Sequence, residues 1–297
     1  MRVLITGGGG FIGAWLARRL AEKRNQVRIF EPGPSSPLFK KIVGPLNSSI
    51  EWTIGDIASS QSVHSAMAGC EAVVHLAAIL APACQADPLK GAMVNLVGTL
   101  NVFNAALGLK IKRVAFTSSA GVYNPSNEAT PLPITHYGAF KLACEGSARA
   151  YWQDHGLASI GFRPFIVYGY GRETGLTAGP SLACRAAALG ETYAIPYVGT
   201  AGLIYVDDVV AAYEAALLRE PSGSRVFNLP GEVGSNDNVV AAIHAVVPQS
   251  KISVGGPLLP FAQDIGEGEL RQVFPDLPAT PLMDGIRRTV ELYRENA

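Results

Sequence analysis

The chain begins Met1-Arg-Val-Leu-Ile-Thr-Gly-Gly-Gly-Gly-Phe-Ile-Gly13, and this stretch decides its fold. Its apolar start predicts a buried strand, and the apolar pattern that resumes at Phe11 predicts a helix. Four glycines between them fit the spacing Gly-x-Gly-x-x-Gly, which lets the backbone turn tightly and bring amide groups close to a pyrophosphate. An acid, Glu31, ends the next strand-like segment. Strand, glycine turn, helix and acid together predict a dinucleotide site.

The composition excludes several classes of protein. Of the 297 residues, 48% are hydrophobic and 16% charged, which is typical of a globular protein with a large core. The formal net charge is zero, so nucleic acid is not an expected partner. The four cysteines are scattered, which predicts buried reduced thiols, and the five histidines have no ligand spacing, which predicts no metal site. With no signal peptide and no apolar run of about 18 residues, we expect a cytoplasmic protein without a membrane partner.

Strand-like and helix-like segments alternate through the first half of the chain. Strands are predicted at 3–6, 27–31, 51–54, 72–76, 113–118 and 158–163, and the longest helices at 88–109 and 136–155. This alternation predicts an α/β fold with a doubly wound, Rossmann-like parallel sheet. Gly, Pro and Tyr become frequent after residue 168. We therefore expect residues 1–168 to form mainly the dinucleotide-binding domain and 169–297 mainly a smaller substrate-binding lobe, with segments around 203–230 returning to the main sheet.

A second motif, Tyr137-Gly-Ala-Phe-Lys141, falls in the predicted helix 136–155. Positions i and i+4 share one helix face, so the phenol and the ammonium are neighbours, and the ammonium favours the phenolate form. Such a phenol can exchange a proton with an alcohol or a carbonyl compound. The hydroxyls of Thr117, Ser118 and Ser119 end a predicted strand, at the sheet edge where open parallel sheets bind ligands. Together these residues predict a catalytic site.

At this point the chain resembles the extended short-chain dehydrogenase/reductases, the NAD-dependent epimerase/dehydratase family. The likeness covers almost the whole chain and depends on an ordered set of motifs. They are Thr6-Gly7-x-x-Gly10-x-x-Gly13, Gly55-Asp56-Ile57, His75-Leu76-Ala77-Ala78, Asn95-x-x-Gly98-Thr99, Thr117-Ser118-Ser119-Ala120, Tyr137-x-x-x-Lys141, Arg163-Pro164, Val167-Tyr168-Gly169 and Val206-Asp207-Asp208-Val209.

The resemblance implies a role for individual residues. It makes Ser119, Tyr137 and Lys141 catalytic, with Ser119 favoured over Ser118 because it directly precedes Ala120. Expected cofactor contacts are Gly7, Gly10, Phe11, Ile12, Gly13, Glu31, Asp56, Ile57, Leu76, Ala77, Ala78, Asn95, Thr117, Tyr137, Lys141 and Arg163. Expected substrate contacts are Ser118, Ser119, Tyr137, Phe165, Arg172 and Arg185.

Glu31 decides the choice of cofactor. It lies where an acid accepts hydrogen bonds from ribose hydroxyls, and a 2′-phosphate there would be repelled. The residues that follow, Pro32-Gly-Pro34, supply no arginine. We therefore predict NAD rather than NADP.

The substrate is less certain because the chain departs from the pattern of nucleotide-sugar enzymes in this family. Those enzymes generally carry Asn where Ile166 stands, and an Arg within the stretch equivalent to Gly199–Tyr205. Arg172 and Arg185 could replace the missing groups, bind a carboxylate, or lie on the surface. The leading interpretation is hydride transfer between NAD and a small hydroxy or keto substrate, such as a sugar, sugar acid or polyol. The alternatives are a nucleotide-sugar 4-epimerase similar to UDP-glucose 4-epimerase with retained NAD, and a non-catalytic dinucleotide-sensing scaffold.

The partner of this chain is expected to be a second copy of itself. The predicted helices 88–109 and 136–155 are long and rich in alanine, and relatives pair through such helices. The alternative is that they only cover the sheet. A homodimer is the prediction.

Overall fold

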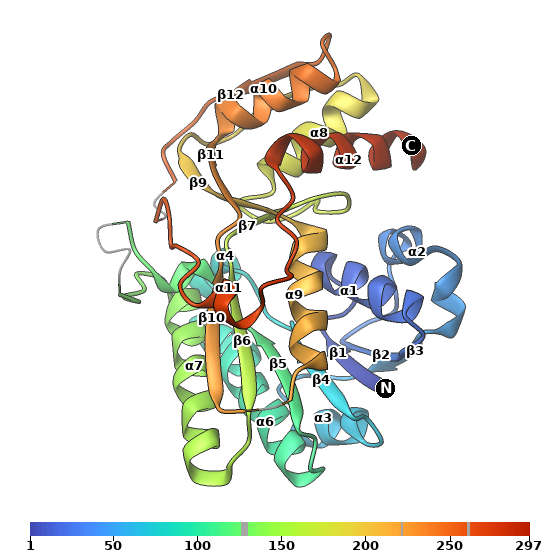
Figure 1. Ribbon diagram of the computed structural model, residues 1–297, viewed down its shortest axis with the longest axis vertical. Coiled ribbons are helices and arrows are strands. Elements are labelled where there is room, and N and C mark those ends of the chain that lie inside the picture. The colour runs from blue at the N-terminus through green and yellow to red at the C-terminus, as the bar shows by residue number, and fades with distance from the viewer. Residues whose placement is uncertain (126–129, 221, 260–261) are drawn as a thin grey trace.

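The computed structural model describes residues 1–125, 130–220, 222–259 and 262–297 (Figure 1). Its strands are β1 Arg2–Thr6, β2 Gln26–Glu31, β3 Glu51–Ile54, β4 Ala72–His75, β5 Arg113–Thr117, β6 Ser159–Pro164, β7 Ile166–Tyr168, β8 Thr192–Ile195, β9 Thr200–Tyr205, β10 Ser224–Leu229, β11 Glu232–Ser235 and β12 Lys251–Val254. Its α-helices are α1 Phe11–Glu22, α2 Pro37–Val43, α3 Ser60–Met67, α4 Ala81–Ala86, α5 Pro88–Ala92, α6 Gly98–Gly108, α7 His136–His155, α8 Gly179–Leu189, α9 Val206–Leu218, α10 Asn236–Val246, α11 Leu270–Val273 and α12 Leu282–Glu295.

The main sheet has seven parallel strands in the order β10-β6-β5-β4-β1-β2-β3. The chain winds outward from β1 in both directions, so the strand order reverses between β1 and β4. In open parallel sheets a ligand binds at such a reversal, beyond the carboxyl ends of the strands. The predicted doubly wound, Rossmann-like sheet is confirmed, and its topology brings the glycine turn after β1 next to the end of β4.

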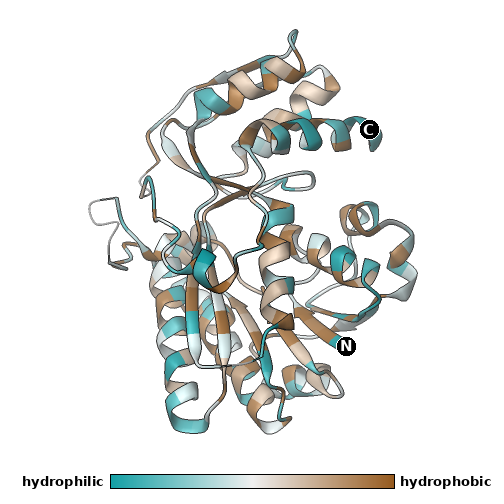
Figure 2. Cartoon of the chain, viewed as in Figure 1, coloured by the Kyte–Doolittle hydropathy of each residue, from teal (hydrophilic) through white to brown (hydrophobic). Residues whose placement is uncertain are grey.

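Helices cover both faces of this sheet. Alternate side chains of β1 point to opposite faces, so Val3 and Ile5 pack with α1 and Leu4 packs with α3 and α6. α1 contacts α9 on the first face, and α6 contacts α3 and α7 on the second. Because both faces are buried, the strands are largely hydrophobic while the outer helix faces are hydrophilic (Figure 2).

The smaller lobe is drawn at the top of Figure 1 and is built mainly from the second half of the chain. β7, β9 and β11 form a three-stranded sheet, and β8 pairs with β12 beside α8, α10 and α12. Of the segments expected to return to the main sheet, β10 does so by pairing with β6. β9 does not, because it pairs with β7 and β11 instead.

The long helix predicted at 88–109 is interrupted by a π-helical turn, Met93–Val97, between α5 and α6. By length and composition the span Pro88–Gly108 could cross a membrane, although no such helix was expected. Core helices meet the same criterion, and this helix packs against α3 and α7. We therefore interpret it as a core helix. The four cysteines are buried and free, as predicted.

Candidate active site

The glycine turn after β1 contacts the end of β4. Gly7 has a φ of +69°, and a Cβ atom placed on it would lie 2.5 Å from the backbone nitrogen of Ala77. A Cβ atom on Gly13 would lie 2.5 Å from the Gly7 carbonyl oxygen. Glycine is therefore required at both positions. The turn leads into α1, whose N-cap Gly10 provides no side-chain hydrogen bond, so the first amide groups of the helix stay available to an anion. This cradle of backbone atoms fits a pyrophosphate.

Glu31 lies at the end of β2, against the glycine turn. Its Oε1 accepts a hydrogen bond of 2.7 Å from the Gly9 amide. Burial raises the pKa of this carboxyl, and the Gly9 hydrogen bond opposes part of that rise. Asp56, on the neighbouring loop, is exposed and accepts from the Ala58 amide at 2.9 Å. Ile57 is buried, and its carbonyl oxygen accepts from Asn101 at 3.0 Å.

A chain of buried hydrogen bonds lies below the turn. His75 Nδ1 is 2.6 Å from the Thr6 hydroxyl, and Nε2 is 2.9 Å from the Thr99 hydroxyl. Thr99 donates its own proton to the Asn95 carbonyl, so it accepts from Nε2–H of His75, and Nδ1 accepts from Thr6. The bond that Nδ1 accepts from Thr6 requires a neutral ring. Burial, with a smaller effect of Lys141, lowers the pKa of His75 to about 3.

Asn95, an expected cofactor contact, is bonded to the loop after Ala78. It is fully buried in the π-helical turn, where its Oδ1 accepts from the Ile79 amide at 2.8 Å. Its Nδ2 donates to the Ile79 carbonyl at 2.9 Å. Asn95 thus holds the loop after Ala78 in place from its position in the π-helical turn.

Tyr137 and Lys141 lie in the first turns of α7. The helix starts at this point because Thr135 accepts from the Gly138 amide at 3.0 Å. Lys141 is 2% exposed and donates to the Thr117 carbonyl at 2.7 Å, with Nζ 5.8 Å from the centre of the Tyr137 ring. Its ammonium therefore lies between the end of β5 and the phenol.

Ser119 lies in the turn that follows β5, close to Tyr137. Its Oγ accepts from the Gly121 amide at 3.0 Å. A Cβ atom on Gly121 would lie 3.3 Å from the Ser119 Oγ and 3.6 Å from the Tyr137 ring. The turn thus brings the serine hydroxyl and the phenol ring to the same glycine, and the predicted trio lies together.

Ser118, an expected substrate contact, and Arg163, an expected cofactor contact, belong to one buried network with Glu145. Ser118 Oγ donates to Glu145 Oε1 at 2.5 Å. Arg163 forms a two-pronged pair with the fully buried Glu145, at 2.7 and 2.5 Å, and donates to the Tyr123 hydroxyl at 2.6 Å. These donors therefore already have protein partners. The Thr117 hydroxyl is likewise bonded to the Tyr213 hydroxyl.

The remaining expected substrate residues lie in three environments. Phe165 is half-buried and packs near Gly202 in the smaller lobe. Arg172 donates to the Val167 carbonyl and to Thr177, and it lies within electrostatic range of Tyr137. Arg185 is exposed on α8, within electrostatic range of Tyr293 on α12.

Sequence reasoning missed Glu145, although a signal was present. Glu145 follows Lys141 by four residues, so it shares the helix face of Tyr137 and Lys141. It also missed Tyr197, which no motif marks. In the described part of the chain, no group of three His, Cys, Asp or Glu side chains could hold a metal ion.

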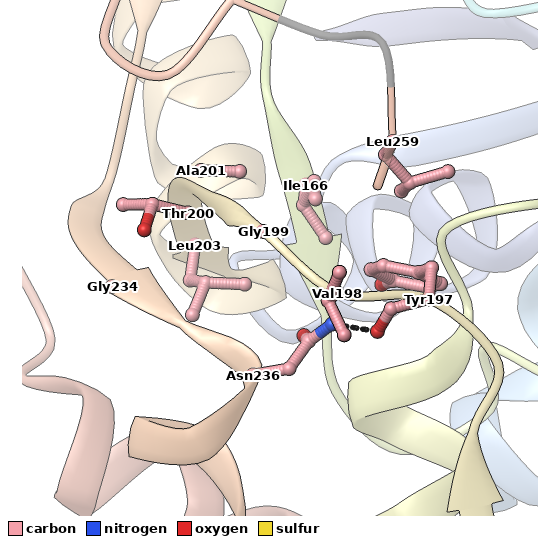
Figure 3. A pocket seen from close by; sticks show the side chains of 10 residues that line it. All are labelled: Ile166, Tyr197, Val198, Gly199, Thr200, Ala201, Leu203, Gly234, Asn236 and Leu259. Atoms are coloured by element: carbon pink, nitrogen blue, oxygen red, sulfur yellow. Dashed lines mark hydrogen bonds between the residues drawn. The ribbon is translucent and has the colours of Figure 1, made fainter. Parts of the chain in front are cut away.

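A pocket in the smaller lobe lies between β7, β9 and β11 (Figure 3). Its lining consists of Ile166, Tyr197, Val198, Gly199, Thr200, Ala201, Leu203, Gly234, Asn236 and Leu259. No lysine or arginine is among them. The amide of Asn236 is already bonded to the Tyr197 carbonyl at 2.7 Å.

Comparison with known proteins identifies relatives that match the whole chain or part of it. It is 29% identical over 319 residues to UDP-glucose 4-epimerase of Mycolicibacterium smegmatis, covering 100% of both chains. It is 29% identical over 187 residues to 3-beta-hydroxysteroid dehydrogenase of Mycolicibacterium neoaurum, covering 58% of this chain and 49% of that one. The aligned region spans about half the length of several such curated relatives.

Solved structures show the fold of the chain, and a family model shows its family. The fold matches UDP-glucose 4-epimerase of Thermotoga maritima with a TM-score of 0.86 and 21% identity, covering 100% of this chain and 99% of that one. The model of the NAD dependent epimerase/dehydratase family matches residues 3–229. The predictions of an enzyme family of the extended short-chain dehydrogenase/reductase type and of NAD as its cofactor are thereby confirmed. The chain belongs to the NAD dependent epimerase/dehydratase family.

Proposed function

We propose that this protein is an NAD-dependent oxidoreductase that interconverts a small hydroxy compound and the matching keto compound. The observation that carries the proposal is the convergence of Ser119, Tyr137 and Lys141 beside the carboxyl ends of β4 and β5. A scaffold that only sensed a dinucleotide would not need a hydroxyl, a phenol and an ammonium at one point.

Each member of the trio has a chemical task in this proposal. Tyr137 takes the proton from the substrate hydroxyl, and the ammonium of Lys141 stabilises the phenolate before that transfer. Ser119 holds the substrate oxygen by a hydrogen bond. The Thr117 carbonyl keeps Lys141 in place through its 2.7 Å bond. When bound, NAD supplies the hydride acceptor for oxidation, and NADH supplies the donor for the reverse reaction.

The cofactor contacts are proposed from the cradle described above. Gly7, Gly10 and Gly13 shape the pyrophosphate cradle, because each brings backbone close to backbone. The amides that start α1, beside Phe11 and Ile12, receive the anion. Glu31 receives the ribose hydroxyls. The loop Leu76, Ala77 and Ala78, which touches Gly7, borders the reactive end, and Asp56 with Ile57 borders the adenine end.

The test is Tyr137→Phe, with NADH absorbance followed against a panel of polyols and sugar acids plus NAD⁺. We expect turnover to fall by about 10²- to 10⁴-fold, as for loss of a general acid–base group. Tyr151→Phe is the matched control, because it removes a hydroxyl from the same helix, where the group is bonded to Asn104 at 2.7 Å. Full turnover in Tyr137→Phe would refute the proposal that Tyr137 is catalytic.

A second candidate is a nucleotide-sugar 4-epimerase, favoured by the full-length alignment with the M. smegmatis protein. It predicts NAD that copurifies with the protein and conversion of a UDP-sugar without net NADH. Against it stands the stretch Gly199–Tyr205, which has no arginine for a diphosphate. Incubation with UDP-glucose and with a hydroxy acid in parallel separates the two functions.

A cytoplasmic homodimer remains our proposal for the assembly. Leu89 and Met93 on the helix 88–108, and Trp152 on α7, are exposed apolar side chains on two helices that contact each other. Exposed apolar side chains on these helices suit pairing with a second copy.

A further inference from the structure

We propose that Trp52 is a second determinant of cofactor choice, which closes the adenosine-ribose site beside Glu31 to any group larger than a hydroxyl at the 2′ position. The inference rests on the cofactor contacts proposed above for Glu31 and the glycine turn, and not on the chemistry of Tyr137. It also explains a glycine that the dinucleotide pattern does not require.

Gly9 is the glycine that the pattern leaves unexplained. The turn fits Gly-x-Gly-x-x-Gly from residue 8 and Gly-x-x-Gly-x-x-Gly from residue 7, and both spacings leave position 9 open to any residue. The φ of Gly9 lies outside the left-handed region, so the backbone conformation does not require glycine either. A Cβ atom on Gly9 would lie 3.0 Å from Cη2 of Trp52 and 3.1 Å from Oε1 of Glu31. Glycine at this position therefore leaves room for the indole and the carboxylate, which occupy the space that a side chain would take.

The indole of Trp52 is fixed by contacts on both of its rings. Trp52 lies on β3, the edge strand next to β2 (Figure 1). Its Nε1 donates to the Gly33 carbonyl at 2.8 Å, in the loop that follows Glu31. The ring packs edge-to-face on the buried Phe39, with ring centroids 5.0 Å apart. Cη2, on the six-membered ring, reaches Gly9. The indole thus extends beside Glu31, from the loop after β2 to the glycine turn.

Glu31 has one oxygen bonded to the protein and one open to a ligand. Its Oε1 accepts from the Gly9 amide at 2.7 Å, and among the described residues nothing donates to Oε2. In the same part of the chain, no lysine or arginine forms an ion pair with this carboxylate. A ribose hydroxyl that donates to Oε2 lies about 3 Å from it. Because the indole of Trp52 lies beside the same carboxylate, the ribose has the indole as its neighbour.

The indole offers nothing to a 2′-phosphate. Its one N–H group is already bonded to the Gly33 carbonyl, and the rest of its surface is carbon. A phosphate carries three strong acceptor oxygens, which in proteins are met by arginine, lysine or several N–H groups. Beside Trp52 these oxygens would lose water and gain no donor. NADP is then disfavoured by two separate effects, which are the charge of Glu31 and the lack of space and donors at Trp52.

The first experiment separates bulk from charge by titration calorimetry with ADP, 2′-deoxy-ADP and 2′-O-methyl-ADP. Both analogues lack the 2′ hydroxyl proton, and only the methyl ether adds bulk. The wild type should bind 2′-O-methyl-ADP about tenfold more weakly than 2′-deoxy-ADP. Trp52→Phe keeps an aromatic ring against Phe39 but is shorter toward Gly9, so it should bring the two affinities to within about threefold. Trp152→Phe, near the carboxyl end of α7, is the control and should behave as the wild type. Equal affinity of the wild type for both analogues, or no binding of ADP, would overturn the proposal.

The second experiment measures the ratio of Kd for NADP⁺ over NAD⁺ in Glu31→Ala, Trp52→Phe and the double variant. Glu31→Ala should lower this ratio about tenfold, and the double variant should lower it about 3- to 10-fold further. A double variant with the ratio of Glu31→Ala would refute the role of Trp52 and leave that of Glu31 intact. Both experiments measure binding without turnover. If Tyr137→Phe keeps full activity, the proposed chemistry fails while the binding results still decide the role of Trp52.

Discussion

The pH dependence of stability should reveal the buried state of His75. The unfolded chain binds a proton on this ring below pH 6.5, whereas the folded ring does so only near pH 3. Between these values the unfolded state holds more protons, so stability falls as the pH falls. The interval from pH 6.5 to pH 5 is about 1.5 pH units. Over this interval the unfolding free energy should fall by about 2 kcal/mol. The ring is 2% exposed, so solvent screens this effect little.

Urea unfolding at pH 7 and pH 5 tests this prediction in the wild type and two variants. His75→Gln removes the titrating group, so its loss of stability between the two pH values should be smaller than the wild-type loss by about 2 kcal/mol. His64→Gln is the control, because His64 is exposed and should leave the wild-type difference unchanged. The reasoning is refuted if His75→Gln loses as much stability between pH 7 and pH 5 as the wild type does.

Two further predictions concern the neighbouring groups. Glu145→Gln should lower the unfolding free energy by about 3 kcal/mol in urea melts, because it leaves Arg163 buried without a counter-charge. Glu145→Met combined with Arg163→Met should recover most of that loss, and a double variant as unstable as the single one would contradict the account. Glu31→Ala should lower the ratio of kcat/KM for NAD⁺ over NADP⁺ by about tenfold, since it removes the charge that repels a 2′-phosphate. An unchanged ratio would show that Glu31 only supports the Gly9 amide.

The sheet was predictable from sequence because its signals are local. A buried parallel strand has a continuous apolar run, and β1, β4 and β5 carry such runs at Val3–Ile5, Ala72–Val74 and Val114–Phe116. The helix α7 was also predicted with its observed bounds, since Thr135 caps its start and Gly156 ends it in the left-handed conformation. β9 was assigned to the wrong sheet because strand pairing depends on distant partners, which residue patterns do not encode.

In the candidate site, too, local features were predictable from sequence and features that depend on distant residues were not. Residue spacing on one helix brought Tyr137 and Lys141 together, and the glycine pattern marked the cradle. The directions of Ser118 and Ser119 depend instead on where β5 ends and on the presence of Glu145 behind it. Asn95 was expected as a cofactor contact because the family resemblance implies it. Its amide bonds with the Ile79 backbone from the π-helical turn, and the sequence gives no local signal of these contacts.

The distribution of charge explains why the site resists full prediction from sequence. Arg163 is paired with Glu145, and Arg19 with Glu214, so each of these cations already has a carboxylate partner. Arg172 looks the same as they do in the sequence. Only the structure shows that its acceptors are the Val167 carbonyl and the Thr177 hydroxyl, with no carboxylate within ion-pair distance among the described residues. A residue pattern gives the charge of a side chain but not its partner, because that partner comes from another part of the chain, as Glu214 does for Arg19.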